Sequence, residues 1–261
     1  MNLDFSEDQK FLQEEARKFL EKENALLRNR TVLENQSYFD QELWSKIVEL
    51  GWTGIRVPEE FGGLGLGHLE LCVIAEELGR FLAPVPFSSS VYLFTEAVIK
   101  YGSEEMKKSL LPKLVSGDIV GTLAVTEDLF APSKENIELS YNSGKINGKK
   151  IAVPDASIAT HALVVAKSSG GISLQIADLS DQGVSIEHQE NIDESRGHFS
   201  ITFNDVKTQS IGDEISGWDI YESIINQAAV LFAYEQIGGS QASLDMAVNY
   251  AKERYAFGRP I

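Results

Sequence analysis

Apolar residues in the first 118 positions recur at helical spacing. Ser6 with Gln9 three residues later has the form of a capping box, and the apolar positions after it fall on one helix face. Further helices are predicted over about 41–50, 69–81, 88–101 and 104–115. The pattern therefore predicts a helical block that ends near residue 118.

After residue 118 the pattern changes to short runs rich in β-branched and apolar residues. The predicted strands include 122–126, 162–166, 172–177 and 199–203. Turn signals lie between them, at 142–144, 147–148 and 168–171, and the last of these reads as the loop of a hairpin. Several short strands separated by turns predict a small β-barrel or sandwich.

One long helix follows, from Asp219 as its expected N-cap to about Ala256. Gly238 and Gly239 lie inside it, and each costs about 1 kcal/mol relative to alanine, so another backbone is expected to pack closely there. A helix of this length needs neighbours for its apolar face, and the sequence after it supplies none. We therefore expect the following residues to lack neighbours in an isolated chain: Leu231, Phe232, Leu244 and Ala247.

Composition excludes several classes of function. The net charge of -16 over 261 residues argues against binding nucleic acid or anionic membrane surfaces. No apolar run is long enough to span a bilayer, and the acidic start has the features of neither a signal nor a transit peptide. The lone Cys72 fits a reducing compartment, so a cytoplasmic location is expected. The four histidines lack ligand spacing, and no metal site is predicted.

The most specific motif ends the chain: Tyr250-Ala-Lys-Glu-Arg-Tyr-Ala-Phe-Gly-Arg-Pro-Ile261. It closely resembles the signature at the end of a long helix in acyl-CoA dehydrogenases. Further stretches resemble the same family in the family's order: 5–12, 50–65, 76–79 and 101–118. The resemblance implies an α+β fold with an N-terminal helical domain (1–118), a middle β-barrel or sandwich domain (119–216) and the first long helix of an incomplete C-terminal helical bundle (217–261).

The resemblance also implies a function. Members of this family hold FAD non-covalently, carry out α,β-dehydrogenation of an acyl-CoA thioester, and pass electrons to electron-transfer flavoprotein or a similar acceptor. The chemistry needs a carboxylate that removes the α-proton while the β-hydrogen leaves as hydride. A homo- or hetero-oligomer is expected. Two alternatives remain open, a non-catalytic partner subunit of a heteromeric acyl-CoA dehydrogenase and an inactive fragment.

Flavin contacts carry over to six residues. One predicted strand faces the flavin ring with Leu123, Val125 and Thr126, and a second does so with Val153. Arg254 and Phe257 match the pair that reaches the FAD of a neighbouring subunit, where an arginine fork suits a pyrophosphate.

The sequence departs from the family at several of the positions that hold the cofactor. Ala131 and Pro132 replace a glycine and a phosphate-facing serine. Pro132 supplies neither a backbone donor nor a hydroxyl. The second flavin strand has Ala152 and Pro154 where many members have an indole and a hydroxyl. These departures weaken the expected anchoring of flavin and acyl-CoA.

No catalytic residue is assigned. In a minority of the family the base lies early in the long helix, at the position of Ala228. The nearby carboxylates, Glu222 and Glu235, are interpreted as structural or solvated, and Glu127 as structural.

Overall fold

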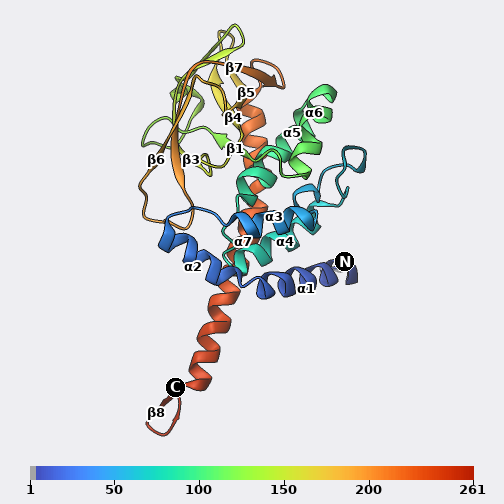
Figure 1. The fold of residues 1–261 in the computed structure, drawn as a ribbon, viewed down its shortest axis with the longest axis vertical. Helices are drawn as coiled ribbons and strands as arrows, with labels where there is room; N and C mark the ends of the chain where they lie inside the picture. The colour runs from blue at the N-terminus through green and yellow to red at the C-terminus, as the bar shows by residue number, and fades with distance from the viewer. Residues whose placement is uncertain (1–3) are drawn as a thin grey trace.

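The computed structural model describes residues 4–261. Figure 1 shows a block of helices beside a β-sheet region, with one long helix, α7, passing both and carrying the C-terminus away from the rest of the molecule. This is the predicted order of a helical region, a β region and a single long helix. No helix within residues 4–261 combines the length and apolar character that a bilayer span requires.

The N-terminal helical block begins with the predicted capping box. The Ser6 side chain accepts a hydrogen bond from the Gln9 backbone at 3.2 Å, and the Gln9 side chain accepts one from the Ser6 backbone at 2.9 Å. The helices of the block are α1 (Glu7–Lys22), α2 (Ala25–Asn35), α3 (Gln41–Glu49), η1 (Trp52–Gly54), η2 (Glu59–Phe61), α4 (His68–Arg80), η3 (Ser88–Thr95), α5 (Glu96–Tyr101) and α6 (Glu104–Val115).

Two helices differ from the prediction. Helix α2 was not predicted, because it follows a left-handed residue, Asn24 (φ 52°), without a side-chain cap, and its apolar residues are confined to one face less clearly than those of α1. The single helix expected over 88–101 is a π-helical segment, η3, continued by α5. All eight residues of η3 are buried, which places this irregular segment at the centre of the molecule.

The strands form a closed, mostly antiparallel sheet. Its hydrogen-bonded order is β1-β4-β2-β3-β7-β5, and β5 also pairs with β4, which closes the barrel. The strands are β1 (Gly121–Ala124), β2 (Ser140–Asn142), β3 (Lys145–Pro154), β4 (His161–Lys167), β5 (Ile172–Asp178), β6 (Val184–Gln189) and β7 (His198–Ile211), and a 3-10 turn, η4 (Lys134–Asn136), precedes β2. The predicted hairpin of β4 and β5 is confirmed.

The pair Asn147-Gly148 is not a turn, as its sequence suggested. It lies within β3, where the register against β7 shifts between Ile146 and Gly148. Gly148 has φ 140°, a conformation that glycine tolerates and other residues rarely adopt. The prediction of a turn at 147–148 is therefore wrong, and the feature at this position is a β-bulge.

Strand β1 joins the two hydrophobic cores. Leu123 and Val125 belong to the core shared with the helices, whereas Ala124 between them belongs to the core inside the barrel. At the start of β1, Gly121 lies against the ring of Phe94 in η3, since a Cβ there would be 2.1 Å from the ring carbon Cγ. The strand is therefore held directly against the π-helical segment.

Helix α7 (Gly217–Glu253) begins and ends differently from the prediction. Its N-cap is Ser216, so Asp219 lies inside the first turn rather than at the cap. It ends at Glu253, and the chain then turns back in a small hairpin of β8 (Tyr255–Ala256) and β9 (Arg259–Pro260) instead of continuing as helix to residue 256.

The α4 and α7 backbones touch where they cross. A Cβ on Gly238 would lie 1.9 Å from the carbonyl oxygen of Glu76, and one on Gly79 would lie 2.0 Å from that of Glu235. A Cβ on Gly239 would meet only the Gly79 oxygen, at an ordinary 3.5 Å. The expected close approach of another backbone is therefore confirmed at Gly238.

The expectation of an uncovered apolar face holds for only half of α7. Leu231 is fully buried and Phe232 packs against the core, so the helical block supplies the neighbours that the sequence seemed to lack. Beyond the crossing the expectation is correct: Leu244 is 56% and Met246 64% exposed, and Ala247 is exposed. Figure 1 shows this part of α7 extending past the helical block.

The two glycines give a matched test of the crossing. Gly238→Ala should lower the free energy of unfolding by roughly 1–3 kcal/mol, because the new methyl group collides with the α4 backbone. Gly239→Ala should be neutral or raise it by up to about 1 kcal/mol through helix propensity. Chemical denaturation measures both, and equal effects of the two substitutions would contradict the crossing.

Candidate functional site

The end of β1 lies directly beside β3. The Thr126 carbonyl accepts a hydrogen bond from the Ile151 N–H at 2.8 Å, so the two segments expected to face a flavin are neighbours. The Leu123, Val125 and Val153 side chains are buried in the two cores, whereas Thr126 is half-buried. The first three residues could therefore meet a ligand through their backbone, and Thr126 could do so through its hydroxyl as well.

A buried ion pair fixes this strand end. Lys150 donates to the Glu127 carboxylate at 2.6 Å and to the Val125 carbonyl at 2.8 Å. Glu127 also accepts from the backbone N–H groups of Glu138 and Leu139. Burial lowers the pKa of Lys150 to about 8, against the opposing effect of the Glu127 carboxylate. Glu127 thus has the structural role that its position in the sequence suggested.

Strand β3 offers less to a flavin ring than β1 does. Ala152 is in a left-handed conformation, with φ 51°, and its N–H donates to Gln189 Oε1 at 2.7 Å. Pro154 has no N–H, and its carbonyl accepts a hydrogen bond from the Thr122 hydroxyl at 2.6 Å. The departures in this strand therefore leave β3 with fewer groups that could meet a flavin than β1 and the two residues after it.

Arg254 and Phe257 lie far from this junction within one chain. They follow the exposed end of α7, in and beside the β8–β9 hairpin (Figure 1). The Phe257 side chain is fully exposed, and the Arg254 guanidinium donates to the Tyr250 hydroxyl and lies over the Tyr250 ring. The chain does not bring this pair together with Thr126.

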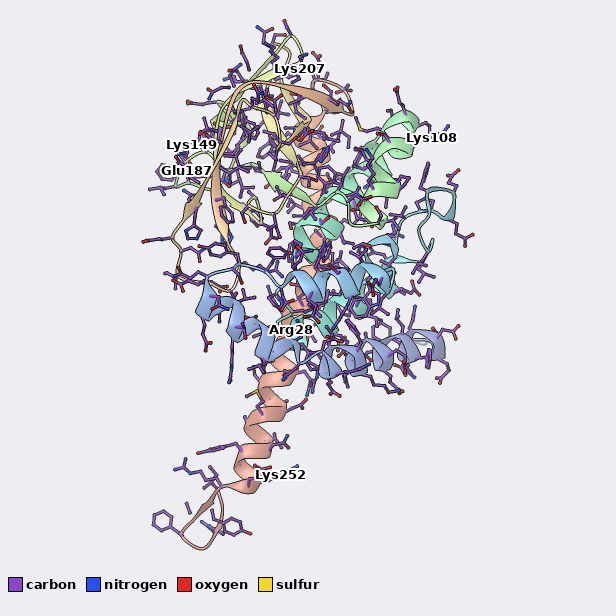
Figure 2. The ribbon with its side chains drawn as sticks, in the orientation of Figure 1. Arg28, Lys108, Lys149, Glu187, Lys207 and Lys252 are labelled. Carbon is purple, nitrogen blue, oxygen red and sulfur yellow. The ribbon has the colours of Figure 1, made fainter. Side chains whose placement is uncertain are left out.

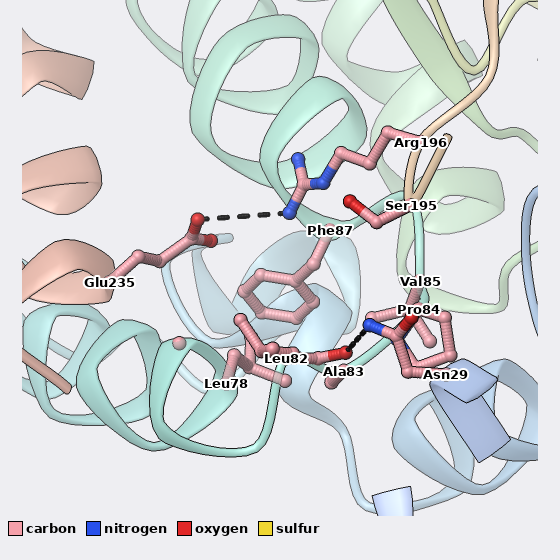
Figure 3. A pocket seen from close by; sticks show the side chains of 11 residues that line it. Asn29, Leu78, Leu82, Ala83, Pro84, Val85, Phe87, Ser195, Arg196 and Glu235 are labelled. Atoms are coloured by element: carbon pink, nitrogen blue, oxygen red, sulfur yellow. Dashed lines mark hydrogen bonds and ion pairs between the residues drawn. The ribbon is translucent and has the colours of Figure 1, made fainter. Parts of the chain in front are cut away.

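A partly buried polar network occupies the place where the helical block, the sheet and α7 meet. Glu235 of α7 accepts a hydrogen bond from the Tyr92 hydroxyl of η3 at 2.9 Å. Its other oxygen is 3.7 Å from the guanidinium of Arg196, which comes from the β6–β7 loop (Figure 3). One charged pair and one hydroxyl therefore connect three segments that are distant in the sequence.

The network continues into the sheet. Asp155, directly after β3, accepts a hydrogen bond from the Ser89 hydroxyl at 2.6 Å, and Arg196 donates to the Ser88 hydroxyl. A cavity of about 70 Å³ adjoins the Arg196–Glu235 pair. Apolar side chains from the end of α4 and the loop after it form most of its wall, together with Asn29 and Ser195 (Figure 3).

The carboxyl groups of this network are shifted toward their protonated forms. Burial raises the pKa of Asp155, and Arg196 and the Ser89 hydrogen bond act in the opposite direction. Burial likewise raises the pKa of Glu235, against Arg196 and Tyr92. Burial and the Arg196 charge therefore act in opposite directions on both carboxyl groups, and Glu235 lines the cavity.

Sequence reasoning missed most of this network. Arg196 lies in a polar loop that reads as a turn, and Tyr92 and Asp155 carry no motif spacing. Glu235 was interpreted as structural or solvated, and its hydrogen bond to Tyr92 is compatible with a structural role. Within residues 4–261 no three His, Cys, Asp or Glu side chains are grouped so that they could hold a metal ion.

Comparison with known proteins identifies similar chains. Residues 6–118 match the family described as "Acyl-CoA dehydrogenase, N-terminal domain". The acryloyl-CoA reductase (NADH) of Anaerotignum propionicum is 28% identical over 278 residues, which cover 100% of this chain and 70% of the relative. The caffeyl-CoA reductase-Etf complex subunit CarC of Acetobacterium woodii is 29% identical over 277 residues, covering 98% of this chain and 72% of the relative.

The fold agrees with these matches. The structure of butyryl-CoA dehydrogenase from Megasphaera elsdenii superposes with a TM-score of 0.90 at 25% identity, covering 100% of this chain and 73% of that one. The similarity therefore includes the helical block, the barrel and α7.

The ion pair at the strand end should dominate local stability. Glu127→Ala removes the acceptor of three donors and leaves Lys150 buried with one carbonyl, so we expect a loss of about 3–5 kcal/mol in the free energy of unfolding. Lys150→Met should cost less, because Glu127 is partly exposed and keeps its two backbone donors. Denaturant unfolding measures both losses, and an equal, small loss in the two variants would contradict this role.

The Glu235 pKa predicts a pH-dependent stability difference. Above the ordinary glutamate pKa and below the raised one, the folded state keeps a proton that the unfolded state has lost, so rising pH costs the native protein stability. Glu235→Gln removes this cost and can still accept from Tyr92. Its stability relative to wild type should therefore increase as the pH rises from the ordinary glutamate pKa of 4.5 to the raised one, by about 1.4 kcal/mol for each unit of pKa shift.

Thermal or denaturant unfolding across this pH range provides the measurement. Glu222→Gln, an exposed position on the same helix, is the matched control for the loss of one carboxylate. A Glu235→Gln difference that is constant with pH, or that follows the control, would show that burial does not raise the pKa of this carboxyl.

Proposed function

We propose that the chain is a member of the acyl-CoA dehydrogenase family, a flavin-dependent protein of acyl-CoA metabolism that takes part in α,β-dehydrogenation of an acyl-CoA thioester; the match of residues 6–118 and the similarity along the whole chain support this. The observation that carries this proposal is the junction of β1 and β3. The 2.8 Å bond from Ile151 to Thr126 holds side by side the two segments that this family turns toward its flavin.

The proposed cofactor is FAD. When bound, it supplies the acceptor for the hydride that leaves the β-carbon of the substrate. We propose that Leu123 and Val125 contact it through their backbone, Thr126 through backbone and hydroxyl, and Val153 from β3. Arg254 and Phe257 would serve the FAD of a neighbouring subunit, which accounts for their exposure at the end of α7.

We assign no catalytic carboxylate in this chain. Glu235 is engaged by Tyr92 and Arg196 on the far side of the η3 segment, and Glu127 is engaged by Lys150 and two backbone donors. We retain a division into 1–118, 119–216 and 217–261, since α6 ends at Val115 and β1 begins at Gly121.

The alternative is a non-catalytic partner subunit, and the exposed part of α7 beyond its crossing with α4 favours it. Leu244 and Met246 are exposed there, which suits a helix that packs against another subunit. The Acetobacterium relative is named as a subunit of an Etf complex. We propose an acyl-CoA substrate, an electron-transfer flavoprotein or similar acceptor, and a homo- or hetero-oligomer as partners.

The proposed location is the cytoplasm. Cys72, the single cysteine of the sequence, is buried, and burial raises the pKa of its thiol to about 11. A thiol in this state is a poor nucleophile, which fits a chain adapted to a reducing compartment.

Flavin retention tests the proposal. The chain expressed alone should purify without flavin and should not couple acyl-CoA oxidation to an artificial acceptor, because we assign none of its carboxylates as the base and removal of a base alone costs about 10²–10⁴-fold in rate. Co-expression with a complete acyl-CoA dehydrogenase should give a flavin-containing complex. Flavin content follows from absorbance, and turnover from acceptor reduction.

Variants then separate a flavin site from simple association. Arg254→Ala and Thr126→Val should each lower the flavin content of the complex, while Arg259→Ala, an exposed arginine in the same hairpin, should not. Retention that is unchanged in both variants would overturn the proposed flavin contacts. Turnover by the chain alone would instead show that one of its own carboxylates acts as the base.

A further inference from the structure

A second cavity lies between α6 and the opposite edge of the barrel. Its volume is about 400 Å³, and it is formed by α6, Ile119, the start of β4, the end of β5 and residues 207–209 within β7. Its polar lining consists of Ser109, Lys113, His161, Asp178, Lys207, Thr208 and Gln209. None of these residues belongs to the β1–β3 junction or to the Glu235 network.

The two lysines of this cavity have no acidic partner. In a protein of net charge -16, carboxylates are abundant, yet neither Lys113 nor Lys207 has one within 4.0 Å among the described residues. Lys207 also stands directly opposite Lys145 in the β3–β7 ladder, an arrangement of like charges that is unfavourable by itself. The Asp205 carboxylate, 3.6 Å from Lys145, compensates only that member of the pair.

The remaining ionisable groups offset only part of the lysine charge. Asp178 is the one carboxylate of the described lining, and hydrogen bonds from the Ser180 hydroxyl and N–H to one of its oxygens, at 2.6 and 2.8 Å, lower its pKa, so its single negative charge compensates one of the two lysines. His161 is held at Nδ1 by the Thr160 hydroxyl at 3.0 Å. Burial lowers the pKa of His161, so it adds no fixed positive charge near pH 7.

We propose that this cavity binds a phosphate-class dianion, with the Lys113 and Lys207 ammonium groups as its charge partners. Lysine ammonium groups are effective phosphate partners as point charges. The Ser109 hydroxyl and the Gln209 amide can donate further hydrogen bonds from opposite sides of the cavity. A bound dianion would also relieve the repulsion between Lys207 and Lys145.

The site is separate from the proposed flavin junction. His161 pairs with Gly121 at the start of β1, whereas Thr126 lies five residues farther along the chain, about 16 Å away if the strand continues extended. The inference therefore does not depend on the proposed function, and the two can fail independently.

Calorimetric titration of the full chain with inorganic phosphate tests the site, at constant ionic strength maintained with chloride. We expect saturable binding that becomes roughly tenfold weaker in Lys113→Met and in Lys207→Met, since each loses one charge-assisted contact. Lys252→Met, at the far end of α7, is the matched control for charge and should bind as wild type; Figure 2 shows Lys207 and Lys252 at opposite ends of the molecule.

A parallel titration with adenosine monophosphate distinguishes the source of the ligand. Tighter binding than that of inorganic phosphate would support a phosphomonoester of a nucleotide, and equal or weaker binding would support free phosphate. Absence of saturable binding of both probes, or the same weakening in Lys252→Met as in the two cavity variants, would overturn the site. Circular dichroism confirms that each variant is folded.

Discussion

The close crossing of α4 and α7 is the contact on which the rest of the structure depends. Gly79 of α4 and Gly238 of α7 have no side chains to separate the two helices, and the backbone at Gly238 packs against the Glu76 carbonyl. This contact determines which part of α7 lies beside η3, and it therefore brings Glu235 to the Tyr92 hydroxyl. It also determines how much of α7 is covered, because the helix leaves the helical block soon after the crossing.

The partly buried polar network connects α7, through η3, to the sheet. Arg196 lies between Glu235 of α7 and the Ser88 hydroxyl of η3, and Asp155 ties the end of β3 to Ser89. Buried charged groups are costly unless they are paired, so this network favours one arrangement of the three regions over others. The same arrangement places the end of β1 beside β3, where the proposed flavin contacts lie.

Local signals in the sequence predicted local structure well. The Ser6 capping box predicts the start of α1, the loop 168–171 predicts the β4–β5 hairpin, and Gly238 predicts a close backbone contact. Each of these depends on residues within a few positions of one another or on a backbone requirement of glycine. The resemblance at the end of the chain added the family and the order of the regions.

Features that depend on distant contacts could not be predicted in this way. Helix α2 has weak caps and no clear apolar face, and Leu231 is covered by helices far away in the chain. The role of Arg196 depends on partners in η3 and α7, which no spacing in the sequence relates to its loop. Hydrogen exchange of the isolated, monomeric chain measures the central claim most directly: amides from Ile220 to Gly238 should exchange as slowly as those of α4, and those from Ser243 to Glu253 much faster. Uniform protection along α7, or rapid exchange on both sides of Gly238, would contradict the crossing as the organising contact.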